Sequence, residues 1–186
     1  MATTLSGSEW WHANQAHYPN SSSVDDLEPS FGSCVERFLD ALRSAGASII
    51  VSSTRRNATR AQLMHYSWKV AYGDTEPEDV PKIPGATIDW DHGETAASRA
   101  AAMDMVKLFG MAHIASLTSN HITGKAIDMT ISWKGTLRVT KPSPALWEIE
   151  STPHTGDNRE LHELGQTLFD VRKLRTDPPH WSFNGR

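Results

Sequence analysis

Three residues of the types that hold catalytic metal ions stand in two separate stretches of this chain. His121 and Asp128 lie close together, and His180 follows much later. Two imidazoles and one carboxylate suit a catalytic zinc ion, which takes three protein ligands and keeps a fourth position open. Asp177 stands three residues before His180 and could take a proton from water at that open position. The sequence contains 1 cysteine, so a cysteine-rich structural zinc site is excluded.

The residues around these side chains could bring them to one point. Gly124 lies between the first two ligands and could support a turn that other residues resist. In residues Lys125 to Trp133, apolar and polar side chains alternate and β-forming residues are frequent, so we predict a strand there. One ligand on the preceding loop and one on this strand could then point to the same place. The two prolines between Asp177 and His180 favour a polyproline II path, whose period of three predicts that both side chains project to the same side.

The pattern of these residues resembles a known enzyme family. Ser-x-His-x-x-Gly-x-Ala-x-Asp begins at Ser119, and Asp-x-x-His-Trp ends at Trp181. This is similar to the zinc D-Ala-D-Ala peptidases, which include D,D-carboxypeptidases, vancomycin-resistance D-Ala-D-Ala dipeptidases and phage L-alanyl-D-glutamate endolysins. The resemblance runs from about Ser33 to the C-terminus. It implies a hedgehog/D,D-peptidase fold and a Zn²⁺ ion held by His121, Asp128 and His180.

The resemblance also suggests roles for residues around the metal. It makes Asp177 the catalytic base, where the family more often has glutamate; some phage members use aspartate, which favours an endolysin-like branch. The family's carbonyl-stabilising arginine follows a strand in a Ser-x-x-Arg context, which implies Arg56, with Arg55 as the alternative one position away. Ser119 is expected to contact substrate. Trp181 is expected either to bind substrate or to pack behind the ligand that it follows.

The resemblance implies a zinc-dependent peptidoglycan peptidase that hydrolyses an amide bond of the stem peptide. Aspartate as the base favours an L-Ala–D-Glu endopeptidase of the endolysin or secreted antibacterial effector type. The alternatives are a D-Ala-D-Ala carboxypeptidase or dipeptidase, and a non-catalytic zinc-containing binding module like the hedgehog relatives. Because both the base and the arginine are present, we favour catalysis. A secreted effector would also have a cognate immunity protein as a partner.

Composition limits the remaining function classes. A chain of 186 residues suits one domain, and we expect a monomer. The formal net charge of −4 gives no electrostatic reason to expect nucleic acid as a partner. No apolar run approaches the roughly 20 residues of a membrane span, and the first residues lack the pattern of a secretory signal. We therefore expect synthesis in the cytoplasm without a signal peptide, and action at the bacterial cell wall or periplasm after lysis or specialised secretion.

Sequence patterns predict a single α+β domain with a mainly antiparallel sheet flanked by helices. Residues 1–29 are predicted to be an extended lead-in, and residues 30–186 the zinc peptidase domain. A capping-box pattern places the first helix start at Ser33, and Lys134-Gly135 predicts a hairpin turn. Two further helices are expected at 59–72 and 95–109, and a last helix is expected to begin near 157. The expected strands span 47–53, 125–133, 136–139 and 146–149, with 47–53 as a central strand.

Several other polar and aromatic residues have a competing structural interpretation. Asp89, Asp91 and His92 could form a second metal site, but a turn stabilised by aspartate side chains is favoured because the first ligand set is complete. Trp10 and Trp11 are predicted to pack rather than to stack on sugars. His65 is predicted to be packed or hydrogen-bonded, and His154 and His162 to be surface or packing residues, rather than metal ligands.

Overall fold

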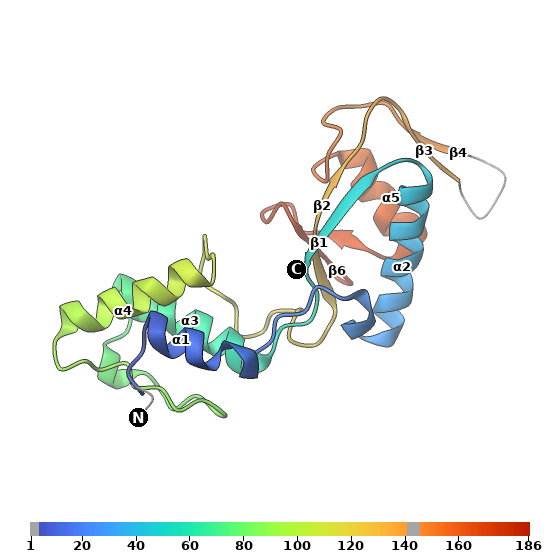
Figure 1. Ribbon diagram of the computed structural model, residues 1–186. Coiled ribbons are helices and arrows are strands. Elements are labelled where there is room, and N and C mark those ends of the chain that lie inside the picture. The colour runs from blue at the N-terminus through green and yellow to red at the C-terminus, as the bar shows by residue number, and fades with distance from the viewer. Residues whose placement is uncertain (1–3, 141–145) are drawn as a thin grey trace. The chain divides into compact units, whose positions relative to one another are not determined.

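The computed structural model describes residues 4–140 and 146–186, which fall into two compact units (Figure 1). The helical unit comprises Met1–Asn20 and Asn57–Ser119, and the sheet unit comprises Ser21–Arg56 and Asn120–Arg186. The α+β class predicted from the sequence is confirmed. No helix in the described ranges combines the length and apolar character needed to cross a membrane.

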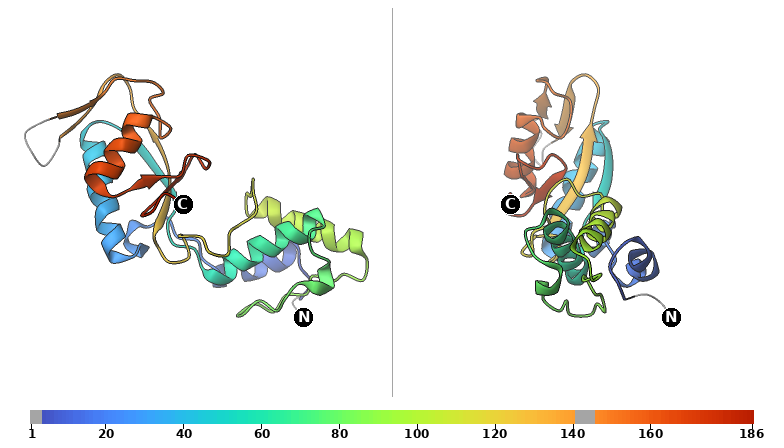
Figure 2. Two further views of the ribbon diagram at one scale, coloured as in Figure 1. Left: turned by 180° about the vertical axis from the view of Figure 1, so that it is seen from behind. Right: turned by 90° about the vertical axis from the view of Figure 1, so that its left-hand side faces the viewer.

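In the helical unit, α3 (Ala58–Tyr72) and α4 (Thr95–Leu108) pack side by side (Figure 2). Two short 3-10 turns, η1 (Gln15–His17) and η3 (Pro77–Asp79), lie in this unit as well. The first part of the chain is not simply extended as predicted, because α1 (Ser8–Asn14) forms within it. Trp10 and Trp11 from α1 are buried in this unit's core, which confirms their predicted packing.

The long loop between α3 and α4 is held by side chains of the residues that also suggested a second metal site. Asp89 accepts a hydrogen bond from the backbone of Asp91 at 3.1 Å, and Asp91 accepts one from Gly93 at 2.8 Å. These are the aspartate-stabilised turns that were favoured from the sequence. His65 bonds the Ala115 carbonyl at 2.8 Å, in line with its predicted structural role.

The sheet unit contains a four-stranded antiparallel sheet in the order β1-β2-β6-β5. The strands are β1 (Ser48–Ser53), β2 (Ala126–Ser132), β5 (Arg172–Lys173) and β6 (His180–Ser182). The prediction of a central strand at 47–53 is wrong in position, because β1 lies at the edge and Ile50 is 66% exposed. An apolar run alone does not distinguish an edge strand from a central one.

A separate two-stranded sheet pairs β3 (Leu137–Thr140) with β4 (Leu146–Ile149). The predicted turn at Lys134-Gly135 joins β2 to β3 along the chain, but these strands do not pair as a hairpin. Leu137 and Val139 from β3 instead point into the core, and Ile149 joins them from β4. The turn dipeptide thus joins two strands that belong to different sheets.

Helices α2 (Pro29–Ser44) and α5 (Arg159–Phe169) pack against each other beside the sheet (Figure 1). The capping-box prediction is wrong at the start of α2: the Glu28 carboxylate caps it by accepting from the Phe31 backbone at 3.1 Å. A further 3-10 turn, η2 (Val24–Asp26), precedes this helix. Together, the two helices and the sheet enclose a core that includes Phe38, Leu42, Leu161, Leu164 and Trp181.

Candidate metal centre

Three predicted ligands converge in the sheet unit. The atoms His121 Nε2, His180 Nδ1 and Asp128 Oδ1 form a triangle whose three sides are each 3.1 Å. His121 and His180 are buried, and Asp128 is half-buried. Within residues 4–140 and 146–186, this is the one group of three or more metal-ligating side chains close enough to hold an ion.

The size of this triangle fits a small metal ion. Tetrahedral zinc lies about 2.0–2.1 Å from nitrogen or oxygen ligands, which places two ligand atoms roughly 3.3 Å apart. The observed separations of 3.1 Å are close to that value. Three protein atoms at these separations would fit one face of a tetrahedral ion and would leave its fourth position for water or substrate.

Hydrogen bonds on the outer side of each imidazole fix which nitrogen faces the ligand triangle. His121 Nδ1 lies 2.6 Å from the Thr54 carbonyl oxygen, and His180 Nε2 lies 3.1 Å from the main-chain oxygen of Arg186. Since a carbonyl only accepts, both outer nitrogens must carry the proton, and in a neutral ring both inner nitrogens then present lone pairs. With both rings neutral, the three inward-facing atoms are all acceptors, and a bound metal ion would hold them together in place of a proton that otherwise joins an imidazole to Asp128.

The main-chain oxygen of Arg186 is itself held by a polar network. Asn120 Nδ2 donates to it at 2.7 Å, and Ser182 Oγ donates at 3.0 Å. Asn120 also donates to Asn184 Oδ1 at 2.8 Å. Because Asn120 precedes one ligand histidine and Arg186 holds the other, this network ties the two imidazoles together.

The two histidines determine the charge state of Asp128. Burial alone raises the pKa of this carboxyl, but hydrogen bonds and charges from His121 and His180 outweigh that effect and hold the pKa well below its ordinary value. The carboxylate is therefore ionised at neutral pH and ready to bind a cation.

Strand register brings two of the ligands together. Asp128 on β2 is the direct cross-strand partner of His180 on β6, so the two side chains share one face of the sheet. On its other edge, β2 pairs with β1. The register of this pair shifts at an irregularity between Val51 and Ser53, and Ser53 is then the cross-strand partner of Asp128. This irregularity leads the chain to Thr54, whose carbonyl orients the third ligand.

The loop that carries His121 is anchored on both sides. The His121 backbone carbonyl accepts a hydrogen bond from the Arg56 amide at 3.0 Å, and the Gly124 carbonyl accepts one from the Glu28 amide at 2.9 Å. Gly124 has a φ of 70°, and an added Cβ there would lie 2.9 Å from Glu28 N. The predicted turn at this glycine is therefore confirmed, and the close approach to Glu28 adds a second reason for glycine.

Of the two candidate arginines, Arg56 is the better placed. It is half-buried and interacts electrostatically with Asp128 and Asp177, whereas Arg55 is exposed. Burial lowers the pKa of Arg56, and the two carboxylates oppose that shift. An arginine stays protonated at neutral pH, so Arg56 supplies a fixed positive charge near the ligand triangle.

Asp177 lies on an exposed turn that leads directly into His180. The predicted polyproline II path is wrong here, because the Asp177 carbonyl accepts from the His180 amide at 3.0 Å and closes a turn over the two prolines. Polyproline II has no such internal hydrogen bond. The turn still keeps the proposed base and a candidate ligand on one short segment, and the charge of Asp177 interacts with that of Arg56.

Two further predicted site residues have different surroundings. Trp181 is fully buried and packs against Phe38 at a ring-centroid distance of 5.5 Å, so it cannot contact a substrate directly. Strand alternation explains this, because neighbours of His180 on β6 point to the opposite face. Ser119 is half-buried and is the last residue of the helical unit, and its contact with substrate stays a prediction.

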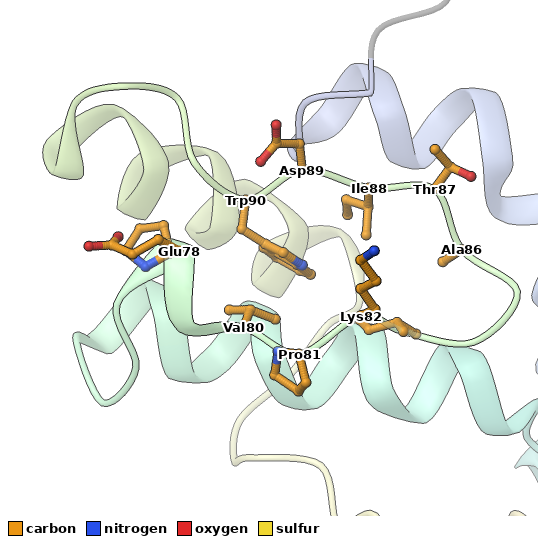
Figure 3. Close-up of a pocket in the computed structure, with 11 residues that line it drawn as sticks. Glu78, Val80, Pro81, Lys82, Ala86, Thr87, Ile88, Asp89 and Trp90 are labelled. Carbon is orange, nitrogen blue, oxygen red and sulfur yellow. The ribbon is translucent and has the colours of Figure 1, made fainter.

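A cavity of about 470 Å³ lies within the helical unit, and its lining includes none of the candidate ligands. Figure 3 shows Ile88 and Trp90 extending between the two arms of the loop that forms it. The lining is mostly apolar, with Lys82, Glu78 and Asp89 as its charged members. It contains no group of metal ligands, and its lining gives no indication of a chemical reaction.

Comparisons of the chain with models of known protein families, with curated proteins and with solved structures found no match.

Proposed function

We propose that the protein is a zinc-dependent peptidase that hydrolyses an amide bond of the peptidoglycan stem peptide, with L-Ala–D-Glu as the preferred bond. The triangle of His121, Asp128 and His180 carries the proposal, because its size and inward lone pairs suit a zinc ion with one open position. Bound Zn²⁺ would supply a Lewis acid and lower the pKa of a water molecule at that position to about 7.

Asp177 would handle the proton of the reaction. Its carboxylate takes a proton from the attacking water as the new carbon–oxygen bond forms at the amide carbonyl. The same carboxyl then gives that proton to the leaving nitrogen as the carbon–nitrogen bond breaks, so protons balance over one turnover. Its exposure on the turn before His180 leaves it accessible to a substrate.

Arg56 would stabilise the negative charge that develops on the carbonyl oxygen. Donors that are already in place before the reaction are often the largest single contribution to catalysis. Arg56 is half-buried and lies close enough to Asp128 and Asp177 for their charges to act on it, which suits a fixed positive charge at the site. The exposed Arg55 next to it could meet a free carboxylate of the stem peptide.

The remaining parts of the proposal concern delivery and partners. Action at the cell wall follows from the substrate, through lysis or specialised secretion. For a secreted effector, a cognate immunity protein would be the expected protein partner.

Digestion of purified peptidoglycan by the zinc-loaded protein tests this function. We expect mass analysis of the released fragments to find new ends at L-Ala–D-Glu. We expect His121→Ala to release no such fragments. His12→Ala replaces an exposed histidine of the helical unit and is the matched control, with wild-type release expected. Loss of single D-Ala residues would instead establish a carboxypeptidase. A zinc-loaded protein that releases nothing from any wall type would overturn the enzymatic proposal in favour of a binding module.

A further inference from the structure

Lys173 on β5 makes three hydrogen bonds to main-chain oxygens of the segment that follows it. Its Nζ donates to the carbonyls of Leu174 and Asp177 at 2.6 Å each, and to that of His180 at 3.3 Å. An ammonium has three donors and no acceptor, so these three carbonyls use its full hydrogen-bonding capacity. A solvated surface lysine has no reason to adopt this arrangement.

The environment of this lysine also differs from that of a surface residue. Lys173 is half-buried, is the cross-strand partner of Trp181, and places its ammonium 5.8 Å from the centroid of that ring. Burial lowers the pKa of Lys173, while Asp157, Asp177 and Asp128 oppose the shift. The charge is thus partly removed from water and compensated by carbonyl dipoles and nearby carboxylates.

The three carbonyls belong to one closed turn. The Leu174 amide donates to the His180 carbonyl at 3.0 Å, and the Asp177 amide donates to the Leu174 carbonyl at 3.3 Å. The His180 amide donates to the Asp177 carbonyl at 3.0 Å. This turn, residues 174–180, carries both the proposed base and a ligand of the metal centre. Its backbone is therefore the part of the site where small displacements matter most.

We propose that Lys173 is a positioning residue whose ammonium holds residues 174–180 in the conformation that aims His180 and Asp177 at the metal centre. The effect on His180 rests on the metal centre, and the effect on Asp177 rests on the proposed peptidase function. An arginine at this position would keep the charge but not the arrangement, because its guanidinium is planar and cannot direct three donors as an ammonium does.

Zinc affinity, measured by competition with a chelator, gives the first test. Loss of a group that supports a ligand typically weakens metal binding about 10–100-fold. We expect Lys173→Met to show a loss in this range and Lys173→Arg to show a smaller one. Lys134→Met replaces an exposed lysine between β2 and β3 and should bind zinc like the wild type.

Amide hydrogen exchange of the metal-free protein gives a second test that does not need zinc. In Lys173→Met, the amides of Leu174, Asp177 and His180 should lose protection by about ten-fold or more, while those of β1 and β2 keep it. Equal loss in all strands would indicate general unfolding and would contradict a local clamp.

The two measurements separate the two proposals. If the wild type binds zinc and Lys173→Met binds it equally well, the role of Lys173 is overturned and the metal centre stands. If the wild type binds no zinc, the proposed function fails, and hydrogen exchange alone decides whether Lys173 holds the turn. Unchanged protection of the three amides would reject the clamp in either case.

Discussion

At the scale of single residues, the chemistry depends on which atoms face the ligand triangle. The types and spacing of His121, Asp128 and His180 were sufficient to predict that these three side chains converge into a group that could hold a metal ion. The groups that orient them could not be predicted, because Thr54 and Arg186 act through main-chain oxygens, which every residue has. A main-chain hydrogen bond between distant residues leaves no pattern of residue types in the sequence.

Asp177→Asn tests the base assignment. The amide keeps the size of the side chain but cannot take the proton, so turnover should fall about 10²–10⁴-fold. Zinc affinity should stay unchanged, because Asp177 is not one of the three ligands. Asp40→Asn replaces an exposed aspartate of α2 and is the control. Near-wild-type turnover of Asp177→Asn on peptidoglycan would remove this residue from the mechanism.

Asn120→Ala tests the polar network behind the imidazoles. The substitution removes the donor that bonds the Arg186 oxygen at 2.7 Å, so that oxygen holds His180 less firmly. We expect zinc affinity to fall about ten-fold, near the low end for groups behind a ligand. Asn120→Asp should weaken binding as well, since it also lacks the donor. Wild-type affinity in both variants, measured by chelator competition, would show that the network does not support the site.

At the scale of elements, the site depends on strand register. The alternation in Lys125 to Trp133 predicted β2 to within one residue at each end. The edge position of β1 and the pairing of β3 with β4 could not be predicted, because both depend on contacts with residues distant in the sequence. The same holds for Trp181: its neighbour His180 suggested a place in the site, while the opposite face of β6 buries it in the core.

Alanine substitutions at two glycines with nearly equal φ distinguish the cost of backbone strain from the cost of a close contact. Gly135→Ala has a φ of 66° and open space around the new Cβ, so it should lower the free energy of unfolding by about 1–2 kcal/mol. Gly124→Ala has a φ of 70° and also places its Cβ 2.9 Å from Glu28 N. Gly124→Ala should therefore lower the free energy of unfolding by roughly twice as much as Gly135→Ala, or more. Urea unfolding of both variants measures this difference, and equal losses would show that the contact with Glu28 is easily relieved.

His162 on α5 makes the stability of the sheet unit depend on pH. Burial lowers its pKa, a hydrogen bond to the Gly156 carbonyl opposes this, and Lys173 and Arg175 lower it further. The folded-state pKa thus lies below 6.5, so under pH 6.5 the unfolded chain binds more protons than the folded one. The free energy of unfolding therefore falls as pH drops through this window.

His162→Gln should reduce this pH dependence. We expect the metal-free wild type to lose more stability than the variant between pH 7 and pH 5, as measured by urea unfolding. Comparison of the two proteins cancels the titration of the other histidines. An identical loss in both would mean that His162 titrates alike in the folded and unfolded states.

At the scale of the whole molecule, the chain builds two compact units from interleaved segments. Composition and helical periodicity predicted the α+β class and most helices. Division into units could not be predicted, because it depends on which distant segments pack together. The three ligands, Asp177 and Arg56 all belong to the sheet unit, although Arg56 and Asp177 lie far apart in the sequence. The proposed zinc ion would therefore be held within this one unit, by the triangle of His121, Asp128 and His180.

Calorimetric titration of the metal-free protein with Zn²⁺ tests this claim most directly. We expect one equivalent to bind tightly, and Asp128, which is already ionised at neutral pH, to release no proton of its own. His121→Ala, Asp128→Ala and His180→Ala should each abolish tight binding, while His12→Ala should retain it. Tight binding that survives the loss of any one of these three side chains, or no binding by the wild type, would contradict a zinc centre at this triangle.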